Sequence, residues 1–113
     1  MPKAITREHL KERLDHDEDF VLVNVLSPET FEKGRVPCSI NVPLPELEEN
    51  APELWPDKDK DIIVYCASYA CDASPRAAEL LEDLGYTNIT VFKGGLTDWE
   101  DADYEAERGS AAA

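Results

Sequence analysis

Two cysteines lie five residues apart in the segment Tyr-Cys66-Ala-Ser-Tyr-Ala-Cys71-Asp-Ala-Ser74-Pro, between an apolar run and a helical pattern. A cysteine acts as a nucleophile through its thiolate, so Cys66 at the end of the apolar run is a candidate catalytic residue. The second thiol, Cys71, is placed to attack an oxidised or sulfur-loaded Cys66 and close a disulfide. The alternative is that both thiols pack as small apolar side chains, because free cysteine is among the most buried residue types.

The elements around Cys66 are predicted from short local patterns. Residues 62–65 are apolar without polar alternation, which is typical of a parallel strand buried on both faces. Ser74 followed by proline predicts an N-cap and a helix over 75–84. Residues 67–73 then form a strand-to-helix loop, in which backbone N–H groups and the helix N-terminus favour the thiolate of Cys66.

The candidate site follows from this placement. Cys66 is the predicted catalytic nucleophile, and its loop consists of Ala67, Ser68, Tyr69, Ala70, Cys71 and Asp72. Cys71 is expected either to line the pocket or to act as a resolving thiol. Arg76 in the first helical turn opposes the helix dipole, which favours a role in anion binding, although a solvated arginine explains it equally well. The three cysteines and two histidines lack zinc-site spacing, so we expect neither a metal nor another cofactor.

Composition and charge narrow the class of protein. A chain of 113 residues supports one domain, and the odd, small number of cysteines argues against a secreted disulfide framework. The net charge of −14 predicts repulsion from nucleic acid and from anionic membranes. The N-terminus lacks the apolar core of a signal peptide and no run reaches transmembrane length, so we expect a cytoplasmic protein. The acidic surface fits either a saline habitat or a basic protein partner.

Strand and helix patterns alternate along the whole chain. Strands are expected at 20–25, 39–42, 62–65 and 88–92, and helices at 7–14 with Thr6 as its cap, from Ser27-Pro28 to 33–34, and at 45–54, 75–84 and 96–101. This order predicts an α/β fold, an open and mostly parallel sheet with helices on both faces, which binds ligands at the carboxyl ends of its strands. We expect a single domain over residues 1–104 and a frayed tail over 105–113.

Several segments, taken in order, carry a family resemblance. They are Leu22-Val-Asn24-Val-Leu26 through Glu29, Phe31, Gly34, Pro37 and Asn41-Val-Pro43, then Val64-Tyr65-Cys66, Ala77-Ala78-Glu79-Leu80-Leu81, Leu84-Gly85-Tyr86, and Phe92-Lys93-Gly94-Gly95-Leu96 with Trp99. The chain resembles a single-domain rhodanese. The resemblance implies a five-stranded rhodanese-like sheet and a sulfurtransferase in which Cys66 takes sulfane sulfur from a donor, such as thiosulfate or a protein persulfide. The persulfide then passes its sulfur to a thiol acceptor, and loop 67–72 supplies backbone donors around it.

The chain also departs from the rhodanese pattern. Typical members carry Asp and Arg where this chain has Asn24 and Leu26, His in place of Arg35, and Gly in place of Cys38. Their loop is shorter and includes a basic residue that binds the anionic donor, which makes thiosulfate a doubtful physiological donor here.

The length of the loop invites comparison with phosphatases of the same fold, which use a Cys-x5-Arg loop. The sixth residue after Cys66 is Asp72, whose carboxylate would repel a phosphate dianion, so phosphatase activity is not expected. Two other classes stay open beside the sulfurtransferase. One is a catalytically degenerate module that binds a basic partner protein, and the other is a thiol-redox sensor built on Cys66 and Cys71.

Overall fold

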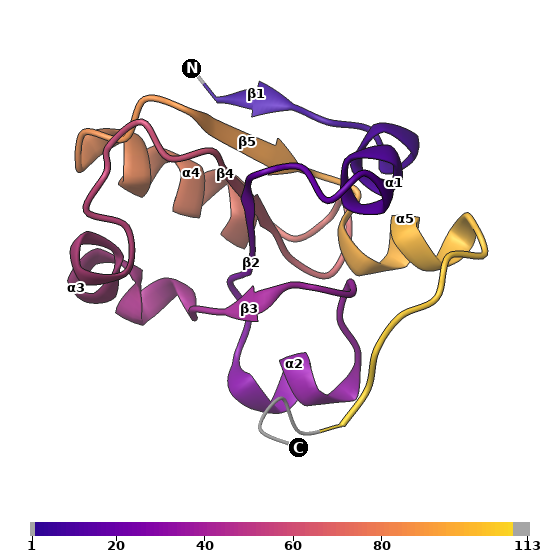
Figure 1. Cartoon of the computed structure of the whole chain (residues 1–113). Helices are drawn as coiled ribbons and strands as arrows, with labels where there is room; N and C mark the ends of the chain where they lie inside the picture. The colour runs from indigo at the N-terminus through magenta and orange to yellow at the C-terminus, as the bar shows by residue number, and fades with distance from the viewer. Residues whose placement is uncertain (1, 110–113) are drawn as a thin grey trace.

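The chain folds into one five-stranded sheet flanked by five helices, in a computed structural model that describes residues 2–109 (Figure 1). In chain order the elements are β1 (Lys3–Ala4), α1 (Arg7–Asp15), β2 (Val21–Asn24), α2 (Pro28–Lys33), β3 (Ile40–Asn41), α3 (Leu44–Leu54), β4 (Ile62–Tyr65), α4 (Ala73–Asp83), β5 (Ile89–Phe92) and α5 (Gly95–Asp101). The strand order is β1-β5-β4-β2-β3, and every pairing is parallel. The predicted open parallel α/β sheet is confirmed.

Most elements begin and end near their predicted positions, but the first strand was not predicted. Thr6 and Ser27 cap α1 and α2 as expected, since their hydroxyls accept from the N–H groups of His9 (3.1 Å) and Thr30 (3.3 Å). The strand missed is β1, two exposed residues that pair with the edge of β5. A strand of two residues is too short to show the alternation that predicts strands, so β1 is defined only by its pairing with β5.

Side chains of the central strand β4 alternate between two separate cores. Ile62 and Val64 pack beneath α3 and α4, whereas Ile63 and Tyr65 pack beneath α1 and α5. These two pairs of helices lie on opposite faces of the sheet (Figure 1). All four are fully buried, which explains why this strand has no polar alternation in the sequence. Cys66 follows directly and belongs to the core beneath α3 and α4.

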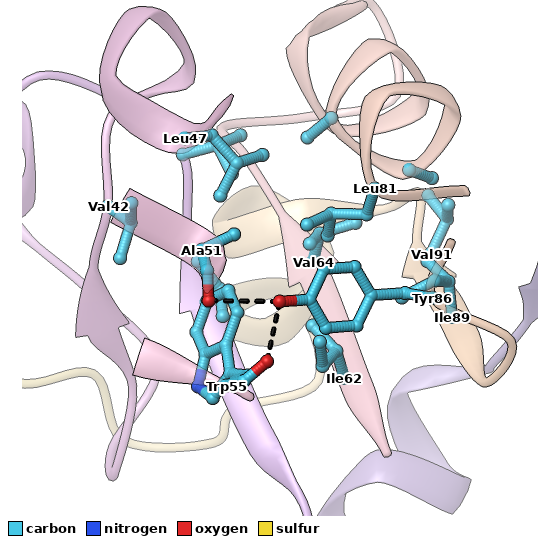
Figure 2. Close-up of a cluster of buried hydrophobic side chains, with 14 of the residues drawn as sticks. Val42, Leu47, Ala51, Trp55, Ile62, Val64, Leu81, Tyr86, Ile89 and Val91 are labelled. Carbon is cyan, nitrogen blue, oxygen red and sulfur yellow. Dashed lines mark hydrogen bonds between the residues drawn. The ribbon is translucent and has the colours of Figure 1, made fainter. Parts of the chain in front are cut away.

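A buried tyrosine joins the two helices of that first core (Figure 2). The hydroxyl of Tyr86 lies between the carbonyl oxygens of Ala51 (2.9 Å) and Trp55 (2.6 Å) at the end of α3, and both accept from its single proton. Its ring meets that of Trp55 edge-on, with 6.5 Å between the ring centres. Because Tyr86 follows α4, this contact fixes α3 against α4 on the face of the sheet that carries Cys66.

The segment after α5 forms hydrogen bonds as far as Gly109, and the expectation that the chain frays from residue 105 stays a prediction. The indole nitrogen of Trp99 donates to the carbonyl of Glu105 at 2.9 Å. Arg35 and Glu107 exchange both backbone hydrogen bonds, and the Arg35 guanidinium also donates to the Gly109 carbonyl at 2.7 Å. The alanine-rich end of the predicted tail, 110–113, lies outside the described residues.

Candidate active site

Cys66 lies at the carboxyl end of the central strand β4, where the fold family of open parallel sheets binds ligands. The residue is fully buried. Its Sγ donates to the carbonyl oxygen of Cys71 at 3.6 Å, and the hydroxyl oxygen of Ser74 lies 3.5 Å from the same sulfur. The thiol is therefore enclosed by the loop that follows it and by the first turn of α4.

The loop 67–72 folds back over the strand end and is held there by α5. The N–H of Leu96 donates to the Cys66 carbonyl at 3.1 Å, and the N–H of Thr97 donates to the Ala67 carbonyl at 2.9 Å. Within the loop, the N–H of Cys71 closes a turn on the Ser68 carbonyl at 3.1 Å. These three bonds fix the backbone of the loop that follows the cysteine.

A glycine at position 95 allows α5 to approach the loop this closely. Its φ is +65°, a conformation that L side chains rarely adopt. A Cβ at this position would also overlap the carbonyl oxygen of Cys66 and the backbone of Ala67. Gly95 is therefore required by both its conformation and the close approach of the active-site backbone.

Lys93 provides a cation that the sequence of the loop itself lacks. Its Nζ donates to the carbonyl of Tyr69 at 2.6 Å and to that of Cys71 at 3.0 Å, so one ammonium group ties two loop carbonyls together. Lys93 follows β5, 22 residues after Cys71 in sequence. In the sequence, Lys93 stands out only as part of the family resemblance. It reaches the loop because β5, which it follows, pairs with β4.

Ser74 has a different role from the predicted one. We expected it to cap the helix, but α4 begins at Ala73, and Asp72 is the N-cap, without a side-chain capping bond. Ser74 is instead buried in the first turn, where its hydroxyl meets the sulfur of Cys66. The prediction was wrong because a serine before proline signals a cap only when its side chain is free to turn back onto the helix.

The loop favours a thiolate at Cys71 rather than at Cys66, contrary to our expectation. Burial raises the pKa of the Cys66 thiol, and the neighbouring Cys71 thiol raises it further, against the opposing effect of the Ser74 hydroxyl and N–H. Burial also acts to raise the pKa of Cys71, but the Cys66 thiol and the backbone N–H groups of Ala73 and Ala67 outweigh it and lower that pKa. The backbone N–H groups that converge in this loop thus stabilise the thiolate of Cys71.

The remaining predicted loop residues lie at the surface. Tyr69 is 65% exposed, and Asp72 is exposed at the helix start. Arg76 lies exposed in the first turns of α4, and no hydrogen bond or ion pair found within residues 2–109 joins its side chain to either cysteine. Its assignment to anion binding stays a prediction.

An open groove of about 540 Å³ borders the loop on the side of β5 and α5. It is lined by Tyr69 and Lys93 from the active-site region and by an ion pair between Arg7 and Asp98, whose atoms are 3.1 Å apart. Charges of both signs therefore line the approach to the loop.

The departures from the rhodanese pattern have structural explanations at two positions. Leu26 packs against the core beneath α3 and α4, where an arginine would be costly to bury. Arg35 is buried away from the two cysteines, with its guanidinium over the Phe31 ring at 4.6 Å and bonded to the backbone of Phe31 and Gly109. Arg35 therefore fastens the C-terminal segment.

Two further properties concern the described part of the chain, residues 2–109. None of its helices combines the length and the apolar character needed to cross a membrane. The same residues include no group of three or more His, Cys, Asp or Glu side chains that could hold a metal ion.

Comparison with known proteins identifies the family. The model of the rhodanese-like domain matches residues 6–102, and the chain belongs to this family. A sulfurtransferase from Allochromatium vinosum is 30% identical over 99 residues, which cover 88% of this chain and 89% of that protein. The family resemblance predicted from the ordered motifs is therefore confirmed.

Two other relatives differ in how much of their own chain the matching domain occupies. A rhodanese-related protein from Thermoplasma volcanium has a crystal structure that superposes with a TM-score of 0.77 and 30% identity, covering 93% of this chain and 97% of that one. An HTH-type transcriptional regulator from Mycobacterium tuberculosis is 32% identical over 107 residues. Those residues are 95% of this chain but 46% of the regulator, so the same domain also occurs as part of a larger protein.

Proposed function

We propose that this protein is a sulfurtransferase or persulfide carrier in which Cys66 holds the sulfane sulfur. The observation that carries the proposal is the position of Cys66 at the carboxyl end of the central strand, enclosed by a loop that α5 and Lys93 fix from outside. Membership of the rhodanese-like family and the sulfurtransferase among the relatives support it.

The residues suggest a two-step transfer. The Cys66 thiolate attacks the outer sulfur of a donor R–S–SH, the donor S–S bond breaks, and R–S⁻ leaves with the bonding electrons. The hydroxyl and N–H of Ser74 face the Cys66 sulfur and stabilise its negative charge. A thiolate acceptor then attacks the outer sulfur of the Cys66 persulfide and regenerates Cys66. Because Cys66 is fully buried, loading requires the loop to move outward.

The charge around the site favours a donor of low charge or a protein persulfide over thiosulfate. The net charge of −14 creates an unfavourable field for a free dianion, and Asp72 is exposed on the loop. The ammonium group of Lys93, which contacts the loop, already binds two carbonyls. Chemistry based on free thiols suits the reducing cytoplasm, which is the compartment that we propose.

Intact-mass measurement tests this proposal. The reduced protein is incubated separately with thiosulfate, polysulfide and glutathione persulfide, and the wild type is compared with Cys66→Ser. We expect the wild type to gain one sulfur atom from the persulfide donors and the variant to gain none. The matched control is Cys38→Ser, which removes an exposed cysteine outside the loop and should load normally. Undiminished sulfur gain in Cys66→Ser, or no gain from any donor in either the wild type or Cys71→Ser, would contradict the assignment.

A further inference from the structure

We propose that Cys71 is a second catalytic thiol, which attacks the Cys66 persulfide, releases its sulfur as hydrosulfide and closes a Cys66–Cys71 disulfide. This inference rests on the proposed persulfide at Cys66. The attack by Cys71 makes the reaction a redox step, because the sulfur is released in reduced form and the protein is left oxidised.

The first argument is the relative position of the two thiols. Cys71 is partly buried and belongs to the same core as Cys66, which lies fully buried beneath it. Their thiols are close enough for each to shift the pKa of the other. An external thiol has no access to Cys66 in this conformation, whereas Cys71 is already in contact with it. An intramolecular attack therefore has the advantage of proximity over an external acceptor.

The second argument is the way in which the loop is anchored. The N–H of Cys71 is bound to Ser68, and the Cys71 carbonyl accepts from both Lys93 (3.0 Å) and the Cys66 thiol (3.6 Å). These bonds hold the Cys71 side chain against Cys66.

The third argument is the charge state of the attacking group. The backbone N–H groups of Ala67 and Ala73 act to lower the pKa of Cys71, which favours its thiolate. The thiolate, and not the thiol, attacks a sulfur–sulfur bond. The loop amides that we expected to serve Cys66 thus prepare its neighbour for the second step.

The chemistry balances without an external oxidant. The Cys71 thiolate attacks Sγ of Cys66, a bond forms between the two cysteine sulfurs, and the persulfide bond breaks with its electron pair leaving on HS⁻. The sulfane sulfur is reduced to hydrosulfide while the two cysteines are oxidised to a disulfide. The next cycle requires a thiol reductant that supplies two electrons. A dithiol, either a protein with a cysteine pair or a small molecule, supplies both in one encounter and is the class of partner that fits.

The experiment compares persulfide lifetimes. Wild type, Cys71→Ser, Cys71→Ala and Cys38→Ser are loaded with glutathione persulfide or polysulfide, freed of donor by rapid gel filtration, and followed by intact mass and hydrosulfide detection. Wild type and Cys38→Ser should lose the added sulfur, release one hydrosulfide per chain, and end two hydrogens lighter than the reduced protein. Both Cys71 variants should keep the sulfur at least about tenfold longer. Dithiothreitol should then restore the reduced mass of the wild type.

The outcomes separate the inference from the function on which it rests. Equal persulfide lifetimes in the wild type and in both Cys71 variants would overturn the role of Cys71 and leave the sulfurtransferase intact, with Cys71 a packing residue. Absence of a persulfide from the wild type and from every variant would overturn both proposals. Two different substitutions guard against misfolding, because serine keeps the polarity of the position and alanine keeps its apolar contact with the core.

Discussion

The loops that follow β2 and β4 leave the same edge of the sheet, but only one of them is built for chemistry. The two strands are parallel neighbours, with Asn24 opposite Tyr65, so their carboxyl ends emerge side by side. After β2 the chain turns within residues 25–27 and enters α2. After β4 it makes the longer loop 67–72, which returns over the end of its own strand.

The two loops also differ in what holds them. The loop after β2 is held by side-chain amides: Asn24 Oδ1 accepts from the Leu26 N–H at 2.9 Å, and Asn41 Nδ2 donates to the Leu26 carbonyl at 2.8 Å. The loop after β4 is held from segment 93–97, through Lys93 and the backbone of α5. The side chain of Asn24 thus anchors the loop after β2, whereas the anchors of the loop after β4 come from outside it and leave its own side chains free.

We expect the largest effect from a substitution that disrupts the contact between α5 and the backbone of Cys66. Gly95→Ala introduces a Cβ that overlaps the Cys66 carbonyl and also strains a positive φ. We expect a loss of about 2–4 kcal/mol in the free energy of unfolding and strongly reduced sulfur loading of Cys66. Denaturant unfolding and intact mass measure the two effects.

Gly85→Ala is the matched control for that substitution. Gly85 has a φ of +101° but only the side chain of Lys58 within 4.0 Å of the added Cβ. It should therefore show the cost of the conformation, about 1–2 kcal/mol, without a change in loading. Equal losses of stability and loading in the two variants would show that overlap with the active-site backbone is unimportant.

Removal of the Lys93 ammonium should loosen the loop with a smaller effect on the fold. Lys93→Met keeps much of the side-chain volume but removes both hydrogen bonds to loop carbonyls. The fully buried Cys66 should then react several-fold faster with iodoacetamide, because exposure of its thiol requires the loop to open. Peptide mass mapping of alkylated cysteines measures the rate at each thiol.

Lys60→Met is the control for charge. Lys60 lies before the opposite end of β4 and pairs with Asp19 at 3.1 Å, so its removal changes the net charge equally without touching the loop. If both lysine variants accelerate alkylation of Cys66 to the same extent, Lys93 acts through the overall charge and does not hold the loop.

The sequence predicted those parts of the molecule that depend on local pattern. The apolar run before Cys66, the capping residues Thr6 and Ser27 and the order of strands and helices follow from hydrophobic periodicity and capping, and they led to the correct sheet. Cys66 was placed at the correct strand end for the same reason.

The interior of the site could not be predicted in this way. Lys93 reaches the loop because β5 pairs with β4, a tertiary fact with no trace in the loop sequence. Ser74 has the local pattern of a cap, but its side chain serves Cys66. Which thiol the loop amides favour depends on the direction of individual N–H groups, which a sequence does not encode locally.

We expect the smallest effect from a substitution beside the loop after β2, which should lower stability without changing sulfur loading. Asn41→Ala removes the amide that donates to the carbonyls of Asn24 and Leu26. We expect a loss of about 1–2 kcal/mol in the free energy of unfolding, since a partly buried carbonyl loses its donor, and no change in sulfur loading at Cys66. Urea unfolding and intact mass, carried out as for Gly95→Ala, report both quantities. A fall in loading as large as that of Gly95→Ala would mean that the two loops act as one unit, and external anchoring would then not explain why only the second carries the chemistry.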